Sequence, residues 1–140
     1  MTINSAAEFI RLRKSEDPAE YRRAAHEDAP LDVWEEVLAS RADMRFWVAQ
    51  NKTVPVAVLT VLSEDSNADV RDMVARKRKL PESLQLKLAS DCESSVRHAL
   101  AYNAKVTEKV LRILTEDPDE FVREAALRRR NAKGHSGEAS

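Results

Sequence analysis

The sequence predicts an all-α protein built from tandem helical repeats, and three observations carry that prediction. Arginine recurs every 26 residues, at Arg45, Arg71, Arg97 and Arg123. Proline recurs at nearly the same interval, at Pro30, Pro55 and Pro81. Both glycines of the 140-residue chain lie in its last seven residues, which excludes glycine-rich phosphate loops and nucleophile elbows from the body. With 43% hydrophobic residues, the chain can form one domain with its own core.

The first expected element is an N-terminal capping helix over residues 5–14. Ser5 and Glu8 have the spacing of a capping box, which satisfies free amide groups at a helix start. Phe9, Ile10 and Leu12 give this helix an apolar side. We expect that side to cover the open end of the repeats.

The repeats follow, at about residues 15–39, 40–64, 65–90 and 91–116, with a partial unit at 117–133. Each predicted unit is a pair of short helices, since its apolar residues have helical spacing on both sides of a turn. Proline opens the second helix, where its missing N–H costs nothing. Asn51 and Asn103 stand where the first helix should end, a place at which asparagine tolerates the left-handed conformation.

The two ends of the repeat region depart from the pattern. In the first unit, Arg23 and Pro30 are three residues too close together, so we expect its first helix to be shortened. In the last unit, the helix turns polar after Leu127, as a terminal capping helix must. Residues 1–133 are predicted to form a single domain, and residues 134–140 a disordered tail.

The unit resembles the leucine-rich repeat variant, a short relative of HEAT-type helical repeats. Residues 65–89 carry the resemblance most fully, at Asp65, Val70, Arg71, Val74, Ala75, Pro81, Leu84, Leu88 and Ala89. The resemblance implies a right-handed α-solenoid of about four to five stacked helix pairs, each of 25–26 residues, behind the capping helix. It also implies a scaffold for binding. The iron–sulfur activity of the founding member requires cysteines ahead of the repeats, and this chain has only Cys92, in a repeat turn.

The sequence shows no constellation for catalysis or metal binding. His26, His98 and His135 fall in different units or in the tail, and no pair has metal-ligand spacing. We therefore expect no enzyme activity, no metal and no cofactor. The N-terminus lacks a signal-peptide pattern and no apolar run is long enough for a membrane span, so a cytoplasmic protein with no membrane contact is expected.

The recurring arginines are expected to be structural, forming salt bridges or capping bonds within or between repeats. Trp47 is expected in the core. Trp34 aligns with Leu59, Gln85 and Leu111, a row that we expect to be half-buried.

Positions that vary between units are better candidates for binding, because repeats keep their fold constant and change their binding face. Two such rows, one and five residues after each arginine, are i, i+4 neighbours and should form one ridge. The ridge consists of Phe46, Gln50, Asp72, Arg76, His98, Tyr102 and Arg128. We expect it to bind another protein, as the surface of a monomeric scaffold or inhibitor. The rival surface is carried by exposed second-helix residues, among them Glu82, Gln85, Lys87 and Arg112.

Charge distribution leaves an alternative open. Residues 1–70 hold 8 basic and 13 acidic side chains, a net charge of −5, whereas residues 71–140 hold 15 and 11, a net charge of +4. A basic edge could bind nucleic acid or phosphate through Arg76, Lys77, Arg78, Lys79, Arg128, Arg129, Arg130 and Lys133. The same residues could instead complement helix C-termini. An acidic first half could equally mask a basic partner such as a nuclease toxin.

Overall fold

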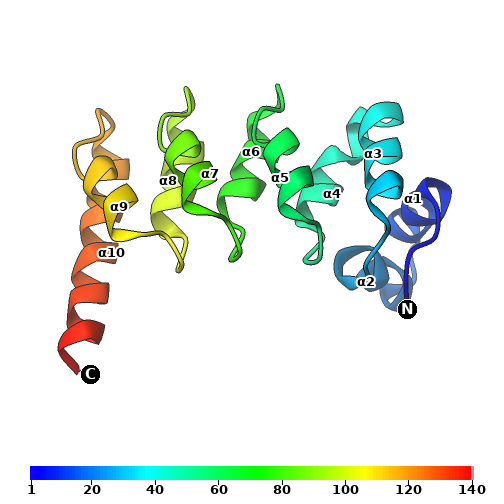
Figure 1. Cartoon of the computed structure of the whole chain (residues 1–140), viewed down its shortest axis with the longest axis horizontal. Helices are drawn as coiled ribbons and strands as arrows, with labels where there is room; N and C mark the ends of the chain where they lie inside the picture. The colour runs from blue at the N-terminus through cyan, green and yellow to red at the C-terminus, as the bar shows by residue number, and fades with distance from the viewer. Residues whose placement is uncertain (140) are drawn as a thin grey trace. The chain divides into compact units, whose positions relative to one another are not determined.

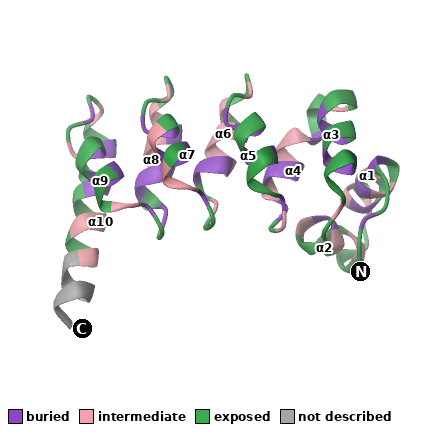
Figure 2. Ribbon diagram, viewed as in Figure 1, coloured by how far each residue is buried: buried purple, intermediate pink, exposed green. Residues whose placement is uncertain are grey.

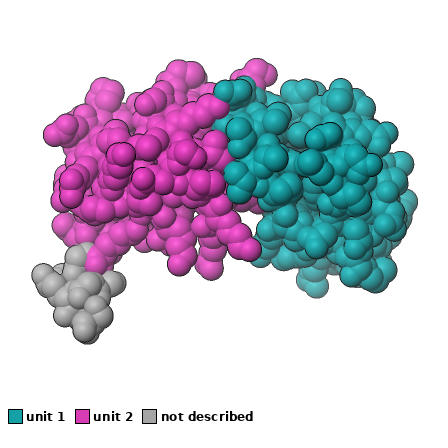
Figure 3. Space-filling model, in the orientation of Figure 1, with its two compact units in different colours: residues 1–65 teal, residues 66–140 magenta. Residues whose placement is uncertain are grey.

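The computed structural model describes the backbone of residues 1–139 and the side chains of residues 1–133, and this part of the chain is all-helical. It forms two compact units, Met1–Asp65 and Ser66–Ser140 (Figure 3). Unit 1 contains α1 (Ala6–Lys14), α2 (Pro18–His26), α3 (Leu31–Ser40), the 3₁₀ turn η1 (Ala42–Met44), α4 (Arg45–Gln50) and α5 (Val56–Leu62). Unit 2 contains α6 (Ala68–Ala75), α7 (Glu82–Leu88), α8 (Ser94–Tyr102), α9 (Glu108–Leu114) and α10 (Glu120–Ala139). No described helix has both the length and the apolar character to cross a membrane.

Unit 1 begins with the predicted N-terminal helix. The Ser5 side chain accepts a hydrogen bond from the Glu8 amide at 3.0 Å, so α1 is capped as expected. Phe9 is fully buried, and its ring meets the Trp34 ring of α3 edge to face, with centroids 5.2 Å apart. Before α1, the Ile3 amide donates to the Asp28 carbonyl at 2.7 Å. The first helix therefore closes one side of the unit 1 core.

Unit 2 consists of helices that alternate between two rows. In one row α6, α8 and α10 pack side by side, and in the other α7 packs against α9 (Figure 1). Each helix of this unit contributes buried residues (Figure 2). Leu88 and Leu114, both expected in the core, are 1% and 0% exposed. The residues three and four before each of them are also largely buried, as amphipathic helices require.

The helix boundaries follow the repeat closely. Pro30, Pro55 and Pro81 each immediately precede a second helix, one residue earlier than the first helical position. Thr107 takes the same place before α9 and caps it by accepting from the Val110 amide at 3.4 Å. The anomaly in the first unit lies at the end of its helix, because α2 ends three residues after Arg23 whereas α8 ends five after Arg97.

One row of residues is more deeply buried than predicted. Trp34, Leu59, Gln85 and Leu111 are all at most 3% exposed, so the expectation of a half-buried row was wrong. Because Gln85 is buried, it cannot belong to the rival binding surface on the second helices, where it was expected. Its amide nitrogen donates to the Leu80 carbonyl at 2.9 Å, and its carbonyl accepts from the Thr107 amide at 3.0 Å. Burial is tolerated because both ends of the amide are hydrogen-bonded. The tail predicted at residues 134–140 lies outside the residues whose side chains are described.

Candidate interaction surface

The recurring arginines join successive turns, as predicted. Arg71 forms two bonds to the Asp91 carboxylate, at 2.7 and 3.2 Å. Arg97 repeats this with Asp117, at 2.8 and 3.2 Å, and also donates to the Asp91 carbonyl at 2.6 Å. In both pairs the acid lies 20 residues after the arginine and almost entirely out of solvent. Hydrogen bonding to the carboxylate raises the pKa of each arginine, so both guanidinium groups stay charged.

The same carboxylates also accept hydrogen bonds from the turn that precedes the next helix. Asp91 Oδ1 accepts from the Glu93 amide at 2.9 Å, and Asp117 Oδ1 accepts from the Asp119 amide at 2.8 Å. Unit 1 contains the corresponding pair of Arg45 and Asp65, at 3.2 Å. These arginines therefore make structural contacts within the protein. The variable residues beside them remain the candidates for binding.

Asn51 and Asn103 end their helices as expected, but for a different reason. Their φ angles are −58° and −65°, so neither adopts the left-handed conformation that was predicted. Asn103 is instead buried, and its Nδ2 donates to the carbonyls of Ala75 and Lys77 at 2.9 and 2.8 Å. Asn51 makes the equivalent bonds to Ala24 and Glu27, at 2.7 and 3.0 Å. Each asparagine satisfies carbonyl groups at the end of an earlier helix.

Arg129 takes the asparagine's place in the last repeat. Its Nη2 donates to the Tyr102 carbonyl at 2.8 Å, one repeat back, and Lys133 donates to the Val106 carbonyl. Arg130 pairs with Glu108 at 3.1 Å. Three of the residues predicted to form a basic edge thus hold α10 against the preceding repeat. Arg78 and Lys79 lie exposed after α6.

Unit 2 brings five of the seven predicted ridge residues onto neighbouring helices. Asp72 pairs with Arg76 along α6. The His98 and Tyr102 rings lie 4.9 Å apart along α8, and Glu124 pairs with Arg128 along α10. The i, i+4 relationship expected from the sequence is therefore present on each helix. Tyr102 is 53% exposed, so its aromatic ring forms part of the exposed surface of the ridge on α8.

The remaining ridge residues, Phe46 and Gln50, lie half-buried on α4 in unit 1. The Phe46 ring meets the Trp47 ring edge to face, with centroids 4.9 Å apart. Trp47, expected in the core, is only half-buried, and the Arg13 guanidinium lies 3.4 Å from its ring centroid. A cation over an indole face is a favourable electrostatic contact. Phe46 thus packs against a cluster that ties α1 to α4.

A shallow hollow opens beside the unit 2 ridge, between α8 and α10. It is lined by Ala101, Tyr102, Ala125, Arg128, Arg129 and Ala132. The three alanines of this lining, its floor, carry no polar side-chain atoms, and Tyr102, Arg128 and Arg129 supply its large side chains. Tyr102 and Arg128 belong both to the hollow and to the predicted ridge.

Sequence reasoning missed one exposed aromatic residue. Phe121, near the start of α10, is 69% exposed. The equivalent positions of the two preceding repeats are Asp69 and Ser95, which are polar. The residue type at this position varies between repeats. Variation of this kind was the criterion that identified the ridge residues, so the same criterion would have identified Phe121.

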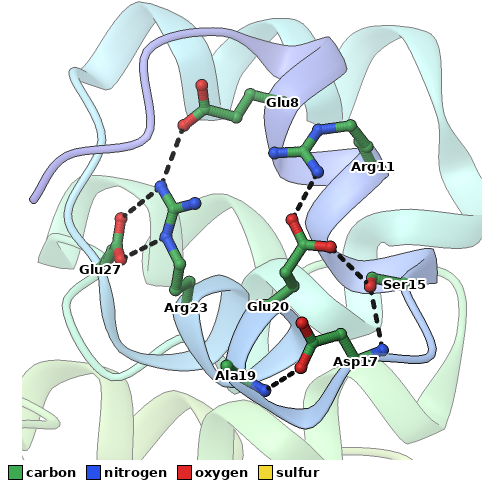
Figure 4. Close-up of polar contacts among 8 residues, drawn as sticks. All are labelled: Glu8, Arg11, Ser15, Asp17, Ala19, Glu20, Arg23 and Glu27. Atoms are coloured by element: carbon green, nitrogen blue, oxygen red, sulfur yellow. Dashed lines mark hydrogen bonds and ion pairs between the residues drawn. The ribbon is translucent and has the colours of Figure 1, made fainter.

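A separate polar cluster surrounds the N-terminal helix in unit 1 (Figure 4). Arg23 binds Glu27 at 2.6 Å and Glu8 at 3.5 Å. Glu20 accepts from Arg11 at 2.6 Å and from Ser15 at 2.9 Å. These bonds lower the pKa of Glu20, mainly through Arg11, and that of Glu27, mainly through Arg23. Every charge in this cluster except the weakly held Glu8 has a close partner, which is typical of a structural network.

The described residues contain no group of three or more His, Cys, Asp or Glu side chains placed to hold a metal ion. Cys92 is exposed, as expected for a surface thiol, and lies 3.9 Å from Arg71. Comparison of the chain with protein-family models, with curated proteins and with solved structures finds no match. Functional inference therefore rests on the chain's own geometry.

Proposed function

We propose that the protein is a non-enzymatic interaction module that binds another protein through the unit 2 ridge. The supporting observation is that the recurring side chains make structural contacts, whereas the variable side chains of unit 2 form pairs along their own helices. The recurring arginines Arg71 and Arg97 form largely buried ion pairs, and Asn103 forms buried bonds to backbone carbonyls. The residues that vary between repeats, such as Asp72, His98 and Tyr102, lie half-buried or exposed on neighbouring helices.

We further propose that the chain is an α-solenoid of the leucine-rich repeat variant or HEAT-like type. Three observations support this: two rows of alternating helices in unit 2, arginine–aspartate pairs at a 26-residue interval, and asparagine bonds that reach one repeat back. Each repeat in such an array contacts its neighbours only, which leaves an extended face for a partner.

The residue types on the ridge fit this role. Tyrosine and arginine are enriched among residues that dominate protein–protein binding energies. Tyr102 is half-exposed. Arg76 directly follows α6 and Arg128 lies near the middle of α10, with 61% and 71% of their side-chain surface exposed. Their ion pairs with Asp72 and Glu124 are of the weak, solvent-exposed i, i+4 type, so a partner can replace them at little cost.

Affinity capture with matched charge-reversal variants tests the proposal. The wild-type chain, Arg76→Glu and Arg112→Glu are each immobilised, exposed to lysate of the source cell, and the retained proteins are quantified by mass spectrometry. Arg112 is the control, because it too is exposed and pairs with an acid four residues away, but on α9. We expect a protein that is retained by the wild type and by Arg112→Glu and lost by Arg76→Glu. Loss by Arg112→Glu alone would place the binding surface on the second helices.

Nucleic-acid or phosphate binding by the basic edge is the alternative. Exposed Arg78 and Lys79 support it, whereas the use of Arg129, Arg130 and Lys133 in structural bonds weighs against it. Retention of the intact chain on heparin and on immobilised DNA at ~150 mM salt separates the two functions, because phosphate binding falls steeply with salt. Strong retention that Arg78→Gln and Lys79→Gln abolish would favour the alternative.

A further inference from the structure

The hollow between α8 and α10 has a chemistry that specifies the kind of segment it can receive. We propose that it binds one aliphatic or aromatic side chain from an acidic segment of the partner protein. This inference rests on the proposed function and adds the partner's chemistry to it. The floor of the hollow is apolar, and both charged side chains in its lining, Arg128 and Arg129, are cationic.

The last repeat has a small side chain where the earlier repeats have a buried apolar one. Val54, Leu80 and Val106 occupy one position of the repeat and are at most 9% exposed. Ala132 stands at the corresponding position, 26 residues after Val106, and is exposed on α10. Val54, Leu80 and Val106 lie in the turn between two helices, whereas Ala132 lies within α10, so only a methyl group lines the hollow at this position. An apolar side chain from a partner would fill the space and cover the exposed ring of Tyr102.

The charged residues at the hollow favour an acidic partner. Arg129 uses one nitrogen on the Tyr102 carbonyl, and its positive charge is not neutralised by that neutral group. Arg128 pairs with Glu124 on the same helix, but 71% of its side-chain surface remains exposed. A carboxylate from the partner can compete for Arg128, because exposed pairs of this kind are weak. Charge-assisted bonds to arginine would then orient the segment over the apolar floor.

The floor also favours a protein segment over a nucleotide. A base would stack on Tyr102 and place phosphate near Arg128, but base edges need hydrogen-bonding groups to be read. The side chains of Ala101, Ala125 and Ala132 contain no hydrogen-bonding group. An aliphatic or aromatic side chain satisfies such a floor, whereas the polar edge of a base does not.

Peptide titration of the full chain, followed by ¹⁵N–¹H correlation spectra, tests the inference. The probes are three short synthetic peptides: an acidic one with a central leucine, the same peptide with serine in place of leucine, and a basic one with a central leucine. We expect the acidic leucine peptide to shift the amide signals of Tyr102, Arg128 and Ala132. The serine and basic peptides should bind these residues at least about fivefold more weakly.

Two variants with matched controls assign the binding to the hollow. Ala132→Leu fills it, and Asn131→Leu adds the same side chain at the adjacent exposed position of α10. Arg128→Gln removes a charge from the hollow, and Arg112→Gln removes an equally exposed charge from α9 that also pairs with a glutamate four residues earlier. We expect Ala132→Leu and Arg128→Gln each to raise the Kd of the acidic leucine peptide about fivefold or more, and the controls to leave it unchanged.

Several results would overturn the inference: no shift at these residues with the acidic leucine peptide, equal binding of the basic peptide, or equal effects of the control variants. Tighter binding of a single-stranded oligonucleotide at the same residues would also overturn it. Because the titration needs no natural partner, its failure is distinguishable from failure of the proposed function. A captured partner that depends on Arg76 but ignores Ala132→Leu and Arg128→Gln would retain the function and remove this inference alone.

Discussion

Asn103 shows how one buried amide can hold two repeats together. Its Nδ2 bonds the carbonyls of Ala75 and Lys77, and its Oδ1 accepts from the Lys105 amide at 2.8 Å. The side chain is 5% exposed, so water does not compete freely for these bonds.

Asn103→Ala should therefore lower the free energy of unfolding by about 1–3 kcal/mol, because it leaves buried carbonyl groups unsatisfied. Urea unfolding measured by circular dichroism gives this quantity. Asn131→Ala, at an exposed position of α10, is the control and should change stability little. Equal stability of the two variants would mean that the hydrogen bonds of the Asn103 side chain make no net contribution to the free energy of unfolding.

The ion pair of Arg97 and Asp117 is the second residue-scale determinant. The two side chains are 13% and 4% exposed, and removal of one partner leaves a largely buried charge. Arg97→Ala should cost about 3–5 kcal/mol of stability, whereas Arg112→Ala should cost about 0–1 kcal/mol, since its pair is exposed. Partner affinity per folded molecule should persist in Arg97→Ala. Lost binding at unchanged stability would assign the arginine to the ligand instead.

At the scale of an element, the cluster around α1 makes unit 1 sensitive to acid. Glu20 and Glu27 have pKa values lowered in the fold by Arg11 and Arg23. The free energy that these pairs contribute is present above the unfolded pKa, about 4.3 for glutamate, and is lost as pH falls through the lower folded value.

Stability should thus decline as the pH falls below about 4.3, and Glu27→Gln should flatten that decline. Thermal unfolding across a pH series, monitored through the tryptophan fluorescence of unit 1, measures this. Glu35→Gln is the control, because Glu35 is exposed on α3. A decline of the same slope in Glu27→Gln and Glu35→Gln would assign the acid sensitivity to other carboxylates.

At the scale of the whole molecule, the repeat register predicts where the core lies. Leu88 and Leu114 are equivalent residues of successive repeats, and both are almost completely buried in unit 2. Leu→Ala at either position should lower stability by roughly 2–5 kcal/mol, through lost apolar burial and a residual cavity. Chemical unfolding of each variant checks the value, with Ile113→Ala, 45% exposed, as the control. Unchanged unfolding midpoints for both leucine variants would contradict the register.

Local patterns predicted much of this molecule. Helical spacing of apolar residues located the helix pairs, proline and asparagine marked their ends, and the serine cap of α1 was found from two residues. Such features depend on neighbours within a few positions of the chain, and those neighbours are visible in a sequence. Constancy across repeats likewise identified Arg71 and Arg97 as structural, although the acids they bind lie 20 residues away.

From the order of residues alone, the all-helical chain, its 26-residue period, the structural arginines and the core leucines could be predicted. Features that depend on which helix packs against which became visible only in the folded chain. The tertiary structure buried Gln85, which the sequence placed on a polar surface, and it turned Asn103, Arg129 and Lys133 toward carbonyls of an earlier repeat. The hollow beside Tyr102 depends on the same packing, because the residues that line it come from two helices that are distant in the sequence. Contacts between distant segments depend on packing, and packing has no local signature in the chain.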